Sequence, residues 1–96
     1  MRTLEESRAA LDTVDREIVR LFEERMTIAR DVAMFKIAHD MPVLDASREK
    51  QVLDSRAAML SDPAWADSVR KLFEEIMSLS RAEQEKLMKA AMEAKC

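Results

Sequence analysis

The chain has 96 residues, with 16 Lys and Arg against 19 Asp and Glu, a net charge of -3 and no glycine. This length predicts one small domain, residues 1–96. The missing glycine excludes phosphate-cradling loops and dinucleotide-binding fingerprints, and the acidic balance argues against a nucleic-acid partner. Ala, Leu, Glu, Lys, Arg and Met are strong helix formers and supply 58 residues, whereas Val, Ile and Thr supply 13, so we expect an all-α fold.

Targeting and metal-binding signals are missing from the sequence. No apolar run approaches the roughly 18 residues of a membrane span, and the acidic first residues are not a secretory signal. The single cysteine, Cys96, is the last residue and is expected to be an exposed thiol. No Cys and His cluster has metal-ligand spacing. We therefore expect a cytoplasmic protein without a membrane partner, metal or cofactor.

Two short segments, 39–45 and 61–63, interrupt the helical pattern, and each contains a proline. Asp45 and Asp62 are good N-cap residues, which predicts helices over about 3–38, 46–60 and 63–93. The first helix would span roughly 54 Å, whereas a compact domain of this size is only about 32 Å across. Because apolar residues continue along the whole helix, we expect long helices of two copies to cover each other in an intertwined homodimer.

Charged residues fall on the stripe of the first helix that is expected to face a core. The stripe has a spacing of three to four residues, with six apolar and four charged members: Leu4, Arg8, Leu11, Asp15, Ile18, Phe22, Arg25, Ala29, Val32 and Lys36. Cations at the edge of such a stripe can extend into solvent. This stripe carries three cations and only one Asp, and a buried charge without a partner is very costly. The pattern therefore favours a site for an anionic ligand.

The other two helices repeat this pattern. The inner side of the second helix is expected to carry Val52, Leu53, Arg56, Met59 and Leu60, with Arg48 and Glu49 one turn earlier. In the third helix, Ser80 and Gln84 are four residues apart on one face and interrupt an apolar stripe. Either set alone is ordinary for a helix edge, but together they predict an enclosed polar pocket within a helical bundle.

The predicted pocket contains cations, carboxylates, a hydroxyl and an amide, but no nucleophile paired with a base. His39 lies in a connecting segment and is expected to be exposed. Such a pocket suits a small polyanion, and a reaction that needs only orientation and stabilisation of charge.

At this point the sequence resembles the all-α chorismate mutases of the AroQ class. The resemblance rests on residues 8–19 with Arg25 and Lys36, on residues 42–49, and on residues 72–76 with Ser80 and Gln84. It implies conversion of chorismate to prephenate, in the branch leading to phenylalanine and tyrosine. It also implies an intertwined homodimer of three-helix chains, long, short and long, with two equivalent sites.

The resemblance also implies a role for each of eight polar residues. Arg25 and Ser80 would hold the ring carboxylate of the substrate. Arg8 of the partner chain and Lys36 would hold the enolpyruvyl carboxylate, and Lys36 and Gln84 would donate to the ether oxygen. Asp45, at the start of the second helix, and Glu49 would meet the ring hydroxyl, with Arg48 supporting the site. The catalytic set is Arg8, Arg25, Lys36 and Gln84, within the substrate-binding set Arg8, Arg25, Lys36, Asp45, Arg48, Glu49, Ser80 and Gln84.

Two other functions fit parts of the pattern. An isochorismate–pyruvate lyase has a similar fold and also needs cations that bind two carboxylates. Asp45 and Glu49, however, match the mutase pattern for the ring hydroxyl. A non-catalytic dimerisation module would use the seam charges only to set helix register, and it predicts no ligand.

Overall fold

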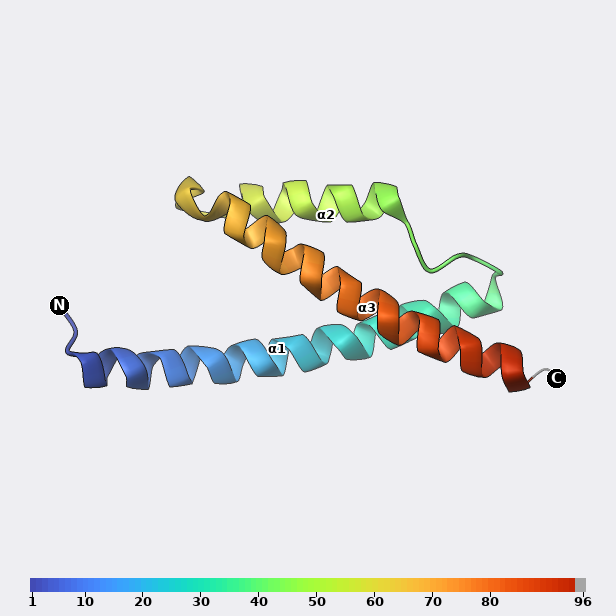
Figure 1. Ribbon diagram of the computed structural model, residues 1–96, viewed down its shortest axis with the longest axis horizontal. Coiled ribbons are helices and arrows are strands. Elements are labelled where there is room, and N and C mark those ends of the chain that lie inside the picture. Colours follow the sequence, from blue (N-terminus) through green and yellow to red (C-terminus); the bar gives the residue numbers. More distant parts are fainter. Residues whose placement is uncertain (95–96) are drawn as a thin grey trace.

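The computed structural model describes residues 1–94, and Cys96 lies outside the described residues. It contains α1 (Leu4–Ala38), α2 (Ala46–Ala58), the short 3₁₀ turn η1 (Pro63–Trp65) and α3 (Ala66–Ala94). The all-α prediction with long, short and long helices is confirmed (Figure 1). No helix in the described chain is long and apolar enough to cross a membrane.

A side-chain cap fixes the beginning of α1, and the backbone conformation of the following residues fixes its end. The Thr3 hydroxyl accepts from the Glu6 amide at 3.1 Å, and the Glu6 carboxylate accepts from the Thr3 amide at 3.2 Å, which completes a capping box. After α1, Asp40 adopts a positive φ of 54°, a conformation that Asp tolerates better than most residues. The chain therefore reverses direction without the glycine that usually follows a helix.

Two aspartates begin the later helical segments, as the sequence predicts. The Asp45 carboxylate accepts from the Arg48 amide at 3.0 Å, and the Asp62 carboxylate accepts from the Ala64 amide at 2.9 Å. Two details of the prediction are wrong. The second helix ends at Ala58 rather than at residue 60, so Met59 caps it and is 71% exposed instead of facing inward. The third helix begins with a 3₁₀ turn, because Pro63 starts a short segment with tighter hydrogen bonding.

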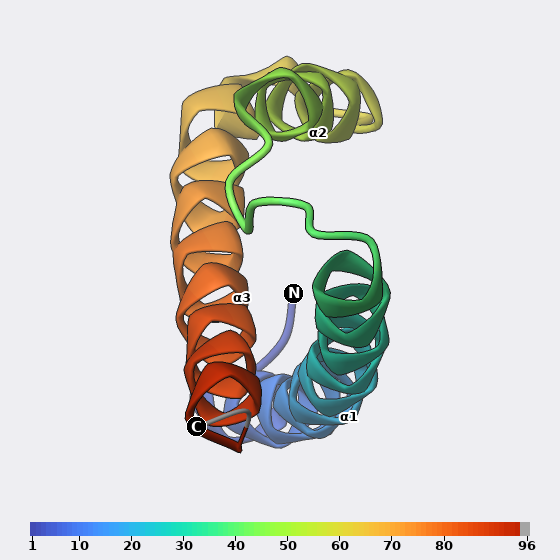
Figure 2. The same cartoon turned by 90° about the vertical axis from the view of Figure 1, so that its right-hand side faces the viewer.

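The three helices form an open arrangement rather than a compact bundle. α3 packs against both α1 and α2, and in the described chain α1 and α2 do not pack against each other (Figure 2). The radius of gyration is 17.2 Å, compared with about 12–13 Å for a compact chain of this length. The geometry therefore agrees with the expectation that α1 is too long for a globular monomer.

The apolar core of one chain is small. In the described chain, its buried apolar residues are Ala29, Ala33, Val43, Val52 and Met77. The beginning of the N-terminal half of α1 extends beyond α2 and α3 in Figure 1. That half leaves large apolar side chains more than half exposed: Leu4, Leu11, Val14, Ile18, Val19 and Leu21.

Candidate active site

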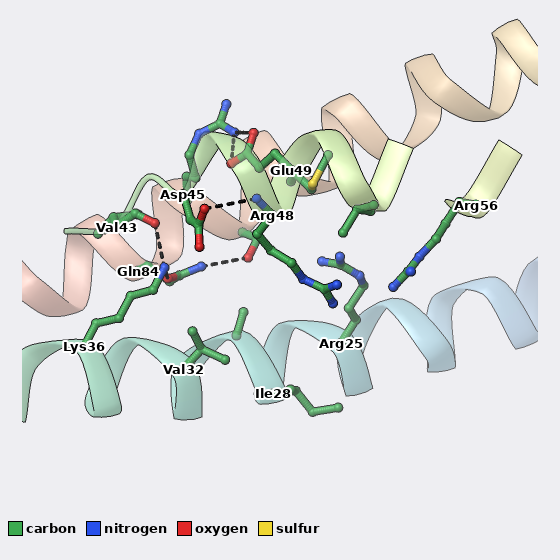
Figure 3. Close-up of a pocket in the computed structure, with 15 residues that line it drawn as sticks. Arg25, Ile28, Val32, Lys36, Val43, Asp45, Arg48, Glu49, Arg56 and Gln84 are labelled. Atoms are coloured by element: carbon green, nitrogen blue, oxygen red, sulfur yellow. Dashed lines mark hydrogen bonds and ion pairs between the residues drawn. The ribbon is translucent and has the colours of Figure 1, made fainter. Parts of the chain in front are cut away.

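A cavity of about 310 Å³ lies between the C-terminal half of α1, one face of α2 and the middle of α3 (Figure 3). Seven of the eight predicted site residues line it, from all three helices and the segment before α2. They are Arg25, Lys36, Asp45, Arg48, Glu49, Ser80 and Gln84. The eighth, Arg8, does not line this cavity and lies on the exposed N-terminal part of α1.

The spacing of residues along α1 sets the length of the cavity. Arg25 and Lys36 are eleven residues apart, which is three helical turns and roughly 16 Å, so they lie at opposite ends of one face. Ala29 lies between them and is buried, and this small side chain allows α3 to approach closely. α1 therefore presents one cation at each end of the cavity.

Lys36 and Gln84 are held in place by hydrogen bonds to fixed neighbours. The Lys36 ammonium donates to the Val43 carbonyl at 2.6 Å and to Gln84 Oε1 at 3.2 Å. Gln84 Nε2 donates to the Ser80 hydroxyl at 3.0 Å, and both Ser80 and Gln84 are buried. An ammonium has three N–H donors and an amide has two, so one donor remains on each of Lys36 and Gln84. These two donors can point at the same ligand atom.

Asp45 has a structural role and also faces the cavity. One carboxylate oxygen caps α2 through the Arg48 amide. The other oxygen points toward the cavity, on the side of Lys36 and Gln84 (Figure 3). This oxygen is an acceptor placed for a hydroxyl donor at this end of the cavity.

The opposite end of the cavity is strongly positive. The guanidinium groups of Arg25, Arg48 and Arg56 point toward one another in Figure 3, and within residues 1–94 none of them forms an ion pair. Burial lowers the pKa of Arg25, and the positive charges of Arg56 and Arg48 lower it further. Like charges brought together in a partly buried site indicate an anionic ligand between them.

Glu49 forms an ion pair that the sequence analysis did not predict. Both oxygens of its carboxylate accept from Arg81 Nη1 in an ion pair between α2 and α3. The sequence analysis did not identify Arg81, although this residue directly follows Ser80. Nor did it assign Arg56 to the site, although Arg56 lies seven residues after Glu49, on the same face of α2.

Two other features of the described chain bear on the chemistry. His39 is exposed, as predicted, and its ring stacks on Phe35 away from the cavity-lining set. The described residues contain no group of three or more His, Cys, Asp or Glu side chains arranged to hold a metal ion.

Two curated relatives are similar to parts of this chain. The "Chorismate mutase" of Methanocaldococcus jannaschii is 39% identical over 51 residues, which are 53% of this chain and 52% of that protein. The "T-protein" of Haemophilus influenzae is 32% identical over 56 residues, 58% of this chain and 15% of that protein. The matches therefore span about half of one relative and a small part of the other.

A comparison with solved structures gave no significant match. The family model "Chorismate mutase type II" matches residues 7–85, which include all eight predicted site residues, the whole of α2 and most of α1 and α3. The chain therefore belongs to the chorismate mutase type II family.

Proposed function

We propose that this protein rearranges chorismate to prephenate. The observation that carries the proposal is the cavity, where three helices of a type II family member place cations and fixed hydrogen-bond donors around about 310 Å³. This volume lies within the range of small-molecule sites, at its lower end. Chorismate is a compact dicarboxylate, so its two negative charges match the positive charge of the cavity.

The positions of the cations match the two carboxylates. Arg25 and Ser80 bind the ring carboxylate, near the cluster with Arg48 and Arg56. Lys36, three turns away on α1, binds the enolpyruvyl carboxylate at the other end. Binding both carboxylates holds the flexible substrate in its folded conformation, which removes much of the entropic part of the barrier.

The reaction is unimolecular, since the ether C–O bond breaks while a C–C bond forms in the same molecule. No proton is transferred and no nucleophile is needed. Negative charge develops on the ether oxygen in the transition state, and the unused donors of Lys36 and Gln84 stabilise it. Because Val43 and Ser80 already fix these two side chains, they need little reorganisation during the reaction.

The acceptors in the cavity favour chorismate over isochorismate, whose ring hydroxyl is on a different carbon. Asp45 points an oxygen toward the cavity, and Glu49 lies one turn further along α2. We propose that these two residues accept from the ring hydroxyl of chorismate.

The active form in this proposal is a homodimer. The apolar surface on residues 4–21 of α1 suits the same surface of a second copy. If two α1 helices pair antiparallel about a two-fold axis near residue 20 or 21, Arg8 of one chain lies opposite the segment between Arg25 and Lys36 of the other. Within one chain Arg8 is roughly 25 Å from Arg25 along the helix, too far for one small ligand. Arg8 therefore completes the site of the partner chain.

The direct test is the loss of chorismate absorbance when the purified protein is added, with prephenate identified by NMR. A parallel reaction with isochorismate is monitored for release of pyruvate. We expect prephenate from chorismate and no pyruvate from isochorismate. Pyruvate release without prephenate would refute the mutase assignment.

The dimer is tested by sedimentation equilibrium and by complementation. We expect a dimer at micromolar concentration. Arg8→Ala and Arg25→Ala are each expected to be inactive. Unfolding them together and refolding them gives about half mixed dimers, in which one site has both arginines. Activity should return to about a quarter of the parent level. If Arg8 acts within its own chain, no activity will return.

A further inference from the structure

Glu49 lines the cavity together with the arginines that we propose bind the substrate. Glu49 and Arg56 share one face of α2, and Arg48 directly precedes Glu49. All three residues line the cavity together with Arg25 from α1. In the described chain Arg25, Arg48 and Arg56 have no carboxylate partner, so electrostatic attraction would draw a free carboxylate toward them.

The Glu49 carboxylate does not point toward these arginines. In Figure 3 it points away from Arg25, Arg48 and Arg56, and its partner lies on α3. Both of its oxygens accept from Arg81 of α3. The side chains of Arg81 and Glu49 are 31% and 24% exposed, so solvent screens this ion pair less than one on the open surface.

We propose that Arg81 is a positioning residue that holds Glu49 away from the substrate-binding arginines. With Arg81 in place, no carboxylate of the described chain pairs with these arginines, and they can bind the carboxylates of the substrate. A carboxylate also has more acceptor sites than Arg81 occupies, so Glu49 can still accept from the ring hydroxyl. Without Arg81, Glu49 becomes an internal competitor for the cavity cations. This inference rests on the proposed function, because it assumes a dicarboxylate ligand.

The alternative is that the Arg81–Glu49 pair only ties α2 to α3. The structure contains a second pair that makes this kind of tie outside the cavity. Arg70 of α3 donates to the Asp54 carboxylate of α2 at 2.9 Å, and neither residue lines the cavity. Arg70→Met therefore breaks an ion pair between the same two helices without releasing a carboxylate into the site. It is the matched control for Arg81→Met.

The experiment measures dicarboxylate affinity by calorimetry in the full-length protein. The ligand is a cyclic dicarboxylate without a ring hydroxyl, so direct contact between Glu49 and a hydroxyl does not affect the result. The variants are Arg81→Met, Arg81→Lys, Glu49→Gln, the double variant Arg81→Met with Glu49→Gln, and Arg70→Met. Circular dichroism and sedimentation verify the fold and assembly of each variant. If Arg81→Met loses helical content, Arg81→Gln supplies the neutral substitution.

We expect Arg81→Met to weaken dicarboxylate binding about three- to tenfold, because the ligand must first displace Glu49 from the cavity arginines. With chorismate, the same variant should have a higher KM and nearly the same kcat. This result is expected because the substrate and its transition state would lose the same amount of binding energy. Arg81→Lys should retain most of the affinity, since it keeps a cation beside Glu49. Glu49→Gln should bind the ligand at least as tightly as the parent does, because it removes a carboxylate from the cavity lining. Arg70→Met should bind the ligand as the parent does.

The double variant distinguishes the two roles of Arg81. It breaks the tie between α2 and α3 but leaves no carboxylate, so we expect it to bind the dicarboxylate as tightly as the parent. If it binds as weakly as Arg81→Met, the pair is only a tie and the inference is wrong. Parent-like binding by Arg81→Met also overturns it. A parent protein that neither binds the dicarboxylate nor consumes chorismate refutes the proposed function itself, and the inference with it.

Discussion

Replacing the Gln84 amide by a carboxyl tests the role of that side chain with almost no change in shape. Gln84 is 6% exposed, accepts from Lys36 at 3.2 Å and donates to Ser80 at 3.0 Å, which leaves one N–H for the substrate. In Gln84→Glu at neutral pH, the carboxylate keeps the contact with Lys36 but has no donor for the ether oxygen. It also places negative charge where negative charge develops in the transition state.

The expected loss is that of one fixed transition-state donor, about 10²–10³-fold in kcat, or about 2.7–4 kcal/mol. Protonation gives the introduced carboxyl an O–H donor, so activity should recover as the pH falls through its pKa. Burial raises that pKa from the usual value of about 4.3, and the Lys36 ammonium lowers it. Recovery should occur on the acidic side of neutrality.

The assay is the loss of chorismate absorbance measured from neutral to acidic pH for the parent, Gln84→Glu and Gln84→Ala. Gln84→Ala is the matched control, because it lacks the donor at every pH. We expect it to be slow throughout, whereas Gln84→Glu becomes faster in acid. If Gln84→Glu shows the pH profile of the parent, Gln84 does not donate to the ether oxygen.

Three further predictions follow from the same geometry. Lys36→Ala should lower kcat/KM by at least about 10²-fold, since its charge and its remaining donor both act on the substrate. Met77→Ala should destabilise the protein by about 2–5 kcal/mol in urea unfolding, because Met77 is 5% exposed in a very small core. Arg56→Met should raise the Tm of the ligand-free protein, because it removes a positive charge that points toward Arg25, whose pKa is lowered first by burial and then by Arg56 and Arg48. The same change should weaken dicarboxylate binding in calorimetry, and an unchanged or lower Tm would contradict the electrostatic reasoning.

Most of the fold could be predicted from the sequence because composition, the positions of the prolines and the capping residues all indicate the same three helices. The prolines and the capping residues Asp45 and Asp62 define the helix boundaries closely. The second helix differs by two residues at its end, where no proline or capping residue marks the last turn. Boundaries of this kind depend on tertiary contacts, so periodicity alone does not determine them.

The candidate site was predicted less completely, for two physical reasons. Arg81 directly follows Ser80, and in a helix neighbouring residues point in directions about 100° apart, so the periodicity that indicated Ser80 and Gln84 did not indicate Arg81. Its long side chain nevertheless reaches Glu49 on α2. Arg56 was expected on the inner side of α2, but only the fold shows that it lies near Arg25 and Arg48.

The charge of the cavity connects its stability to its proposed chemistry. Burial and the positive charges of Arg56 and Arg48 all lower the pKa of Arg25, so its charged form is disfavoured in the ligand-free chain. In the proposed function, a carboxylate of the ligand neutralises this positive charge at one end of the cavity. At the other end, hydrogen bonds already hold Lys36 and Gln84 in position to donate to the ligand. Such a site requires a rigid support, yet one chain buries only five apolar residues among those described. The same exposed half of α1 that leaves the core so small also carries Arg8, so pairing two copies would both stabilise the fold and complete the set of cations.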